Sequence, residues 1–191
     1  MEHQNGQYGT EQLLVQSILD GNKQAFTILI ENTERLVAGI VCKMITNTHD
    51  QRDVAQETYL KVYNSLPAFG FRSKLSTWVA AIAYNSCVDH LRRKKAVYAM
   101  EAINEEAVEN GDAAVFRDRS ALLQSAIGRL PPVYRTLIVM FHNQEMSYEE
   151  IAEITRMPVG TVKNYLFRAR KTLKNALLMN YRKEDILVIS I

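Results

Sequence analysis

The chain has 191 residues, of which 47% are hydrophobic and 23% are charged, so it has enough apolar sequence to fold into one or two compact domains. This composition excludes a fibre, a wholly disordered chain and a disulfide-rich scaffold. Its formal net charge of +2 is mild for a protein that binds nucleic acid. The two cysteines, Cys42 and Cys87, lie far apart and complete no zinc-binding pattern, so we expect no metal and no cofactor.

Residues 1–9 are polar and lack the basic and apolar regions of a secretory signal. No apolar run approaches the roughly 20 residues that a membrane-spanning helix needs. We therefore expect a protein of the cytoplasm.

Apolar residues recur at helical rather than alternating spacing, and only 8 glycines and 4 prolines interrupt the chain, so we predict an all-α protein. In the N-terminal half, Thr10 is a candidate N-cap, Pro67 ends a helix, and Ser76 is a second candidate N-cap. The predicted helices of this half are about 11–19, 23–46, 51–66 and 77–95.

The charges divide the chain into three blocks. Residues 1–95 hold 11 basic and 9 acidic side chains, residues 96–120 hold 2 and 6, and residues 121–191 hold 10 and 6. The net charges of the blocks are therefore +2, −4 and +4. We predict two small helical domains, an N-terminal bundle at 1–95 and a C-terminal domain at 121–180, joined by a flexible acidic linker at 96–120 and followed by a tail at 181–191.

The C-terminal domain contains the pattern of a helix-turn-helix. Ser147 and Glu150 have the spacing of a capping box and begin a short helix, and a tight turn at 155–160 leads into a longer one. The predicted helices of this domain are about 121–130, 133–143, 147–154 and 161–174.

The last of these helices has a polar and basic face opposite its apolar stripe. The residues on or beside that face include Lys163, Asn164, Phe167, Arg168 and Lys171. Lysine and arginine bind phosphate or the guanine edge, and asparagine pairs with adenine. Basic helix faces are often merely solvated, but the turn and the capped helix before this one favour DNA binding.

A second group of candidate DNA-binding residues lies in the N-terminal domain. Trp78, Asn85, Asp89 and Arg92 project along nearly one line of the helix that follows Ser76. The loop 69–74 before it offers two aromatic and two cationic side chains, which suit an unstacked base. The alternative is that Trp78 and the phenylalanines belong to the hydrophobic core.

A small acidic and polar patch lies on the preceding helix. Asp53, Gln56 and Glu57 stand at i, i+3 and i+4, so they share one face. Without a histidine or a second carboxylate cluster nearby, this patch is a poor metal site, and contact with another protein is the better interpretation.

Three motifs occur in order along the chain. They are DQRDVAQETY at 50–59, LSTWVAAIAYN at 75–85 with DHLRR at 89–93, and LPP at 130–132 with SYEEIA at 147–152 and VGTVK at 159–163. Together they cover about residues 10–178 and resemble bacterial RNA polymerase sigma factors of the extracytoplasmic function (ECF) group. The resemblance implies a factor that binds core RNA polymerase, directs it to promoters through their −10 and −35 elements, and promotes promoter melting.

The resemblance also implies a role for three groups of residues. Core polymerase would be bound by Asp53, Gln56 and Glu57. The −10 element would be bound and melted by Phe69, Phe71, Arg72, Ser73, Lys74, Trp78, Asn85, Asp89, Arg92 and Arg93. The −35 element would be bound by Thr161, Lys163, Asn164, Phe167, Arg168 and Lys171. The acidic linker would pass through polymerase near the path of the RNA.

The chain departs from the family pattern at three places. Lys163 and Tyr165 stand where many members have arginine, which leaves the preferred −35 sequence open. Ala55 replaces a commonly larger aliphatic residue. The tail 186–191 is apolar and β-branched, unlike the usual polar ending, and the family assigns it no role.

The partners that the resemblance implies are core polymerase, promoter DNA and an anti-sigma factor, which in this family can be membrane-bound; neither catalysis nor a small-molecule substrate is expected. One alternative is a free-standing helix-turn-helix regulator that binds its operator without polymerase. The other is an enzyme that uses His142, Glu145 or Cys87, and no nucleophile elbow, phosphate loop or paired-acid motif supports it.

Overall fold

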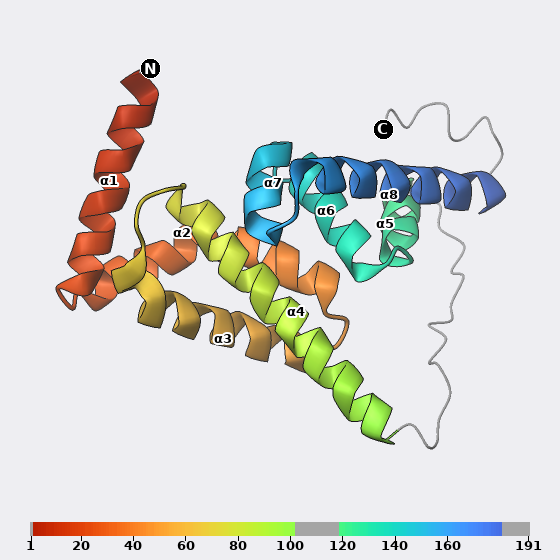
Figure 1. Cartoon of the computed structure of the whole chain (residues 1–191), viewed down its shortest axis with the longest axis horizontal. Helices are drawn as coiled ribbons and strands as arrows, with labels where there is room; N and C mark the ends of the chain where they lie inside the picture. The colour runs from red at the N-terminus through yellow and green to blue at the C-terminus, as the bar shows by residue number, and fades with distance from the viewer. Residues whose placement is uncertain (1, 102–118, 181–191) are drawn as a thin grey trace.

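The computed structural model describes residues 2–101 and 119–180, with side chains described for 9–94 and 123–178. Every regular element within these ranges is helical, which confirms the predicted all-α class (Figure 1). The first range contains α1 Glu2–Leu19, α2 Lys23–Met44, α3 Thr48–Ser65, the short 3-10 helix η1 Leu66–Ala68 and α4 Leu75–Glu101. The second contains α5 Arg119–Gly128, α6 Pro132–His142, α7 Tyr148–Thr155 and α8 Val159–Asn180.

The segment predicted as a linker, 96–120, is partly helical at both edges. α4 continues to Glu101, and α5 already begins at Arg119. The centre of the predicted linker, 102–118, and the tail, 181–191, lie outside the described residues.

Asparagine side chains cap two helices of the first domain. Asn22 Oδ1 accepts hydrogen bonds from the backbone N–H groups of Gln24 and Ala25 at 3.0 and 3.3 Å, which starts α2. Asn47 caps α3 in the same way. Gly21, in the turn before α2, has φ of +89°, a left-handed conformation that glycine adopts without a Cβ clash.

Two of the predicted N-caps are wrong. Thr10 lies inside α1, which already begins at Glu2. Ser76 lies inside α4, which begins at Leu75. The free backbone N–H of Leu75 is instead satisfied by Glu11 of α1, whose Oε2 accepts it at 3.2 Å. A carboxylate from a distant helix therefore replaces the local cap.

Replacing Glu11 by alanine is expected to lower the free energy of unfolding by about 0.5 to 2 kcal/mol, the range for losing a helix N-cap. The variant also leaves a half-buried helix terminus without its acceptor. Urea denaturation measures the change. Gln12→Ala, at an exposed position on the same helix, is the matched control and should change stability little.

The core of the first domain lies between α2, α3 and α4. Its largest fully buried side chains include Leu29, Val37, Ile40, Val41, Met44 and Leu66. Tyr59 of α3 adds a polar link, because its hydroxyl lies 3.2 Å from the Thr33 hydroxyl of α2. This bundle holds α3 and α4 packed against each other, and both helices carry predicted functional residues.

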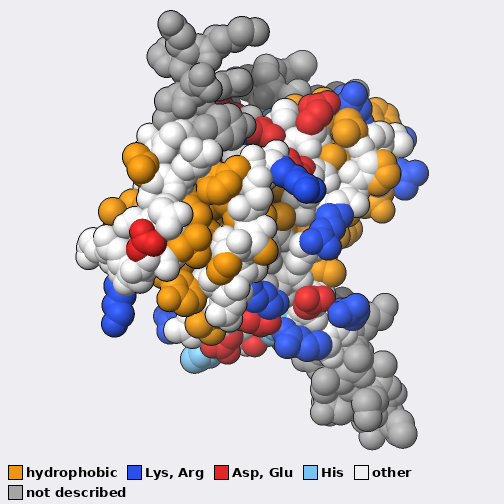
Figure 2. All heavy atoms as spheres, turned by 60° about the vertical axis from the view of Figure 1, so that its left-hand side comes forward, with side chains coloured by type: hydrophobic (Ala, Val, Ile, Leu, Met, Phe, Trp, Pro, Cys, Tyr) orange, Lys and Arg blue, Asp and Glu red, His pale blue; other side chains and the backbone are white. Residues whose placement is uncertain are grey.

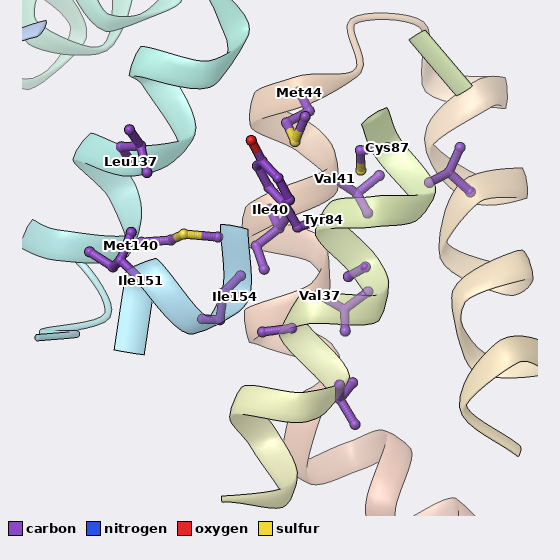
Figure 3. Close-up of a cluster of buried hydrophobic side chains, with 14 of the residues drawn as sticks. Val37, Ile40, Val41, Met44, Tyr84, Cys87, Leu137, Met140, Ile151 and Ile154 are labelled. Atoms are coloured by element: carbon purple, nitrogen blue, oxygen red, sulfur yellow. The ribbon is translucent and has the colours of Figure 1, made fainter. Parts of the chain in front are cut away.

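The two domains pack against each other, an arrangement about which the sequence makes no prediction. α6 packs on α2 and α7 packs on α4, so the two cores form one continuous cluster of buried residues. Figure 3 shows Ile40 of the first domain pointing toward Met140 and Ile154 of the second. The helix-turn-helix therefore rests directly on the first domain (Figure 1).

Candidate polymerase and promoter interfaces

An exposed stripe runs along α3. Asp53 and Gln56 are exposed, as the predicted contact patch requires. Leu60, two turns beyond Asp53 on the same face, is 65% exposed although it is a leucine, and Tyr63 is 52% exposed. Exposed apolar side chains next to polar ones are typical of a protein interface. The sequence analysis missed Leu60, although its i+7 spacing from Asp53 could have indicated it.

Glu57, the third residue of the predicted patch, is engaged within the domain. Its two carboxylate oxygens lie 2.8 Å from Lys61 Nζ and 3.2 Å from Arg93 Nη2 of α4. The hydrogen bond from Lys61 is the largest influence that lowers the pKa of Glu57. This carboxylate therefore joins α3 to the basic part of α4, and Arg93 is held toward α3.

A similar ion-pair cluster lies at the start of α3. Asp50 Oδ2 is 3.0 Å from Lys94 Nζ and 3.2 Å from His90 Nε2, both on α4. These groups lower the pKa of Asp50, with the hydrogen bond from Lys94 as the largest cause. The two clusters fix the angle between α3 and α4.

The loop between η1 and α4 is built around three aromatic side chains in contact. Phe69 is only 6% exposed, and its ring lies 4.7 Å from the ring of Phe71 and 5.0 Å from that of Trp78. Phe69 is thus a core residue that supports the other two. Phe71 is half-buried and has φ of +52°, a left-handed conformation that is uncommon for an aromatic residue. Such backbone conformations cluster at functional sites.

A groove of about 650 Å³ adjoins this loop, between α1 and η1. Its lining combines the two phenylalanines of the loop with apolar and amide side chains of α1, among them Leu13, Leu19 and Gln12. Leu13 is 74% exposed, and hydrophobic side chains gather on this side of the molecule (Figure 2). The groove has the apolar walls and the few polar groups of a ligand site.

The polar line predicted on α4 is present. Trp78, Asn85 and Asp89 are all partly exposed, and Asp89 Oδ1 pairs with Arg92 Nη2 at 3.1 Å. Arg92 itself is largely exposed. The opposite side of α4 is buried, with Ala80, Ala83 and Cys87 at 0% exposure. The structure therefore presents this line to solvent from a rigid helix.

The helix-turn-helix forms as predicted. Ser147 and Glu150 make a full capping box, in which each side chain accepts a hydrogen bond from the backbone N–H of the other residue. α7 ends at Thr155, and its C-cap residue Arg156 has the left-handed φ of +55° and turns the chain toward Pro158. α8 is anchored by an apolar stripe that includes Val162, Leu166, Ala169 and Leu173, all at most 2% exposed.

Most of the predicted DNA-binding residues of α8 lie on its free face. Lys163, Asn164, Phe167, Arg168 and Lys171 are exposed, and Thr161 is half-buried. An aromatic stack borders this face, since the rings of Phe141 and Tyr148 are 4.9 Å apart and nearly parallel. Lys163 Nζ lies 5.3 Å from the centre of the Tyr148 ring, within the range of a cation–π contact.

Side chains of the two domains meet at their edges. Lys74 Nζ, from the loop before α4, lies 2.9 Å from Glu150 Oε1 at the start of α7. Lys43 Nζ of α2 donates to Gln124 Oε1 of α5 at 3.4 Å. The loop and the helix-turn-helix, which the sequence placed in separate domains, are thus brought together.

Two of the residues considered for an enzyme, Cys87 and His142, lie in different domains. Cys87 is fully buried in the first domain, where burial raises the pKa of its thiol to about 12. His142 lies in the second domain and accepts a hydrogen bond from Arg170 Nε at 3.4 Å. Among the described residues, no group of three or more potential ligands could hold a metal ion. Within those same ranges, no helix is long and apolar enough to span a membrane.

Comparison with protein families gives two matches along the chain. Residues 29–97 match Sigma-70 region 2, and residues 120–173 match Sigma-70, region 4. The first match covers most of α2, all of α3 and η1, and most of α4. The second match covers the helix-turn-helix.

Two characterised relatives are similar over nearly their whole length. The ECF RNA polymerase sigma factor SigW of Bacillus subtilis is 32% identical over 176 residues, which cover 85% of this chain and 94% of SigW. The ECF RNA polymerase sigma-E factor of Haemophilus influenzae is 33% identical over 181 residues, which cover 88% and 95% of the two chains.

Two solved structures share the fold. CnrH in complex with the cytosolic domain of CnrY is 22% identical, with a TM-score of 0.64 over 88% of this chain and 97% of CnrH. RpoE of Bartonella quintana in complex with the anti-sigma factor NepR is 21% identical, with a TM-score of 0.65 over 82% of this chain and 98% of RpoE.

Proposed function

Because the chain belongs to the ECF sigma factors, which direct RNA polymerase to promoters, we propose that its two domains divide promoter recognition between the surfaces described above. The α3 stripe docks on core polymerase. The loop 69–74 and the polar line of α4 capture and melt the −10 element. The free face of α8 reads the −35 element. The observation that carries this division is that α3, α4 and α8 each present polar or basic side chains on an exposed face, and that the loop 69–74 contacts α4 through Phe69 and Trp78.

The docking surface is proposed to consist of Asp53, Gln56 and Leu60. These side chains are exposed and lie along one face of α3, which is held from behind by α2 and α4. Glu57 contributes indirectly, because its contacts with Lys61 and Arg93 fix α3 against α4. An apolar side chain flanked by polar ones matches the composition of protein interfaces.

The −10 surface is proposed to combine stacking with hydrogen bonding. Phe71 and Trp78 rest on the buried Phe69, so their rings are held ready for an unstacked base, and the adjoining groove of about 650 Å³ offers it room. Asn85 and Asp89 supply base-edge contacts. Arg72 and Arg92 are exposed cations beside them that suit phosphate contacts.

The −35 surface gives a direct test of this assignment. Lys163→Gln and Arg168→Gln are each expected to weaken binding of the polymerase holoenzyme to promoter DNA. Removal of one phosphate contact should also lower, by about 1, the magnitude of the salt slope, which is the slope of the logarithm of the binding constant against the logarithm of the salt concentration. The measurement is holoenzyme affinity for a promoter duplex over a range of salt concentrations. Arg129→Gln, an exposed cation outside α8, should leave the slope unchanged. Unchanged slopes for both α8 variants would show that this face does not contact the −35 element.

We further propose that the protein has no catalytic activity and acts in the cytoplasm, where polymerase and DNA meet. An anti-sigma factor is a third proposed partner, supported by the two structural relatives that were solved with such partners. Copurification of a tagged chain from its native cell, followed by identification of bound proteins, tests this partner. Recovery of polymerase alone would argue against it.

A further inference from the structure

Two stacked aromatic rings of the C-terminal domain each contact a cation of α8. The rings of Phe141, near the end of α6, and Tyr148, at the start of α7, lie 4.9 Å apart at 21°. Lys163 Nζ is 5.3 Å from the centre of the Tyr148 ring, and Arg170 Cζ is 4.9 Å from that of Phe141. Both distances lie within the range of a cation–π contact. Three helices therefore build one stack, in the order Lys163, Tyr148, Phe141, Arg170.

The two rings stand on a rigid frame. Leu137 and Met140 of α6 are fully buried, so the end of α6 that carries Phe141 is anchored in the core. Tyr148 directly follows Ser147, the N-cap of α7, and the capping box fixes the chain at this point. Both rings are themselves half-buried, so the stack is accessible at the surface.

Arg170 is held at a second point. Its Nε donates a hydrogen bond to His142 Nε2 at 3.4 Å, and the His142 ring lies 5.0 Å from that of Phe141. Partial burial, and then the charge of Arg170, lower the pKa of His142, so at neutral pH the imidazole is neutral and can accept this hydrogen bond. Among the described residues, the terminal guanidinium nitrogens of Arg170 have no hydrogen-bond partner.

Both cations of the stack are available to an anion. Within the described part of the chain, no carboxylate pairs with Lys163 or Arg170. The two residues are seven positions apart, so they lie on the same side of α8 and about 10 Å apart along its axis. Fixed cations in a row along a helix suit the regularly repeated phosphates of a DNA strand.

The ring contact matters for Lys163 because a lysine side chain is long and flexible. An unrestrained lysine loses rotamer freedom when it binds a phosphate, and this loss weakens binding. Tyr148 restrains Lys163 in the free protein, yet Lys163 remains exposed and its ammonium group can still reach a ligand. A cation–π contact at an exposed site corresponds to about two- to fivefold in an equilibrium constant.

We propose that Phe141 and Tyr148 are positioning residues for recognition of the −35 element, and that Arg170 is a further phosphate contact. The stack holds Lys163 in the conformation that meets DNA and presents Arg170 on the same side of α8. This inference rests on the proposed function, because it assumes that the free face of α8 contacts DNA. The helical spacing of α8 could not indicate either ring, since both belong to other helices.

The first test is a double-mutant cycle on Tyr148 and Lys163, measured as holoenzyme affinity for a promoter duplex with full-length variants. Tyr148→Leu keeps an apolar side chain but removes the ring, and it should weaken binding by about two- to fivefold. In the Lys163→Gln background the same substitution should have little further effect, because it acts through Lys163. Tyr148→Phe keeps the ring and should bind as the wild type does.

The second test concerns Arg170. Arg170→Gln should lower the magnitude of the salt slope by about 1, with Arg129→Gln again as the control. Phe141→Leu should weaken binding by about two- to fivefold in the wild type. It should have little further effect in a variant that carries both Lys163→Gln and Arg170→Gln, since both cations that the rings position are then absent.

A measurement without DNA separates this inference from the proposed function. The ring current of Tyr148 should shift the NMR signals of the Lys163 Hε protons upfield in the free protein, and Tyr148→Leu should abolish the shift. An absent shift, or an equal loss of affinity from Tyr148→Leu with and without Lys163, would overturn the positioning role. An unchanged salt slope in Arg170→Gln would overturn the phosphate contact. If the shift is present but Lys163→Gln leaves DNA binding unchanged, the proposed −35 surface itself is wrong, and this inference fails with it.

Discussion

Replacing Leu60 by aspartate is expected to lower the affinity of the protein for core RNA polymerase by about 30-fold or more, the loss that corresponds to about 2 kcal/mol at an interface hot spot. The leucine is 65% exposed in the free protein, so the substitution removes little packing there. In the docked state it would place a charge where polymerase covers an apolar side chain. Equilibrium binding of the labelled protein to core polymerase measures the effect.

A matched control exists on the same domain. Leu13 of α1 is 74% exposed, and Leu13→Asp introduces the same charge away from α3. It should leave core affinity unchanged. Asp53→Lys should weaken binding as Leu60→Asp does. If neither α3 variant changes the affinity, polymerase docks elsewhere.

Substituting Asn85 or Asp89 by alanine should slow formation of the open promoter complex by about 5- to 150-fold on some −10 sequences and hardly at all on others. The reason is that each variant lacks one base-edge hydrogen-bonding group, worth about 1 to 3 kcal/mol of discrimination. The rate is measured by permanganate footprinting on a set of promoters that differ only in the −10 element.

The control for this experiment is Asn32→Ala, an exposed asparagine on α2 outside the proposed surface. It should not change the rate on any promoter. A uniform slowing by Asn85→Ala or Asp89→Ala, together with a lower free energy of unfolding, would show that these side chains support the fold rather than read DNA.

Local sequence was sufficient to predict the helix-turn-helix. The capping box of Ser147 and Glu150 is formed within four residues, and the apolar stripe of α8 follows from helical periodicity alone. The ends of α8 were less predictable, since it runs from Val159 to Asn180 rather than 161–174. The ends of a helix depend on tertiary contacts, which the helix propensities of the residues do not include.

Contacts between distant residues could not be predicted from the pattern. The cap that Glu11 provides for Leu75 joins residues 64 positions apart, and nothing local distinguishes this glutamate from a solvated one. Ile40 and Tyr84 have the spacing of ordinary core residues, so the sequence pattern does not distinguish burial against a second domain from burial within their own domain.

The candidate site was predictable by residue type but not by burial. Phe69 and Phe71 look equivalent in the sequence, yet Phe69 is 6% exposed and supports Phe71, whose backbone is left-handed. Leu60 was overlooked because a leucine at helical spacing is usually buried. Which aromatic or apolar side chain is presented to a partner is decided by the tertiary packing around it.

The aromatic cluster beside the loop also has an optical consequence. Trp78 is the only tryptophan of the chain, and its ring lies 5.0 Å from that of Phe69. The tryptophan emission of the free protein therefore originates entirely from one side chain of α4 that contacts the loop to which we assign base capture. A single-stranded oligonucleotide that stacks on this side chain would quench the emission without any dye, so the protein carries a native fluorescent reporter beside the surface that we propose for base capture.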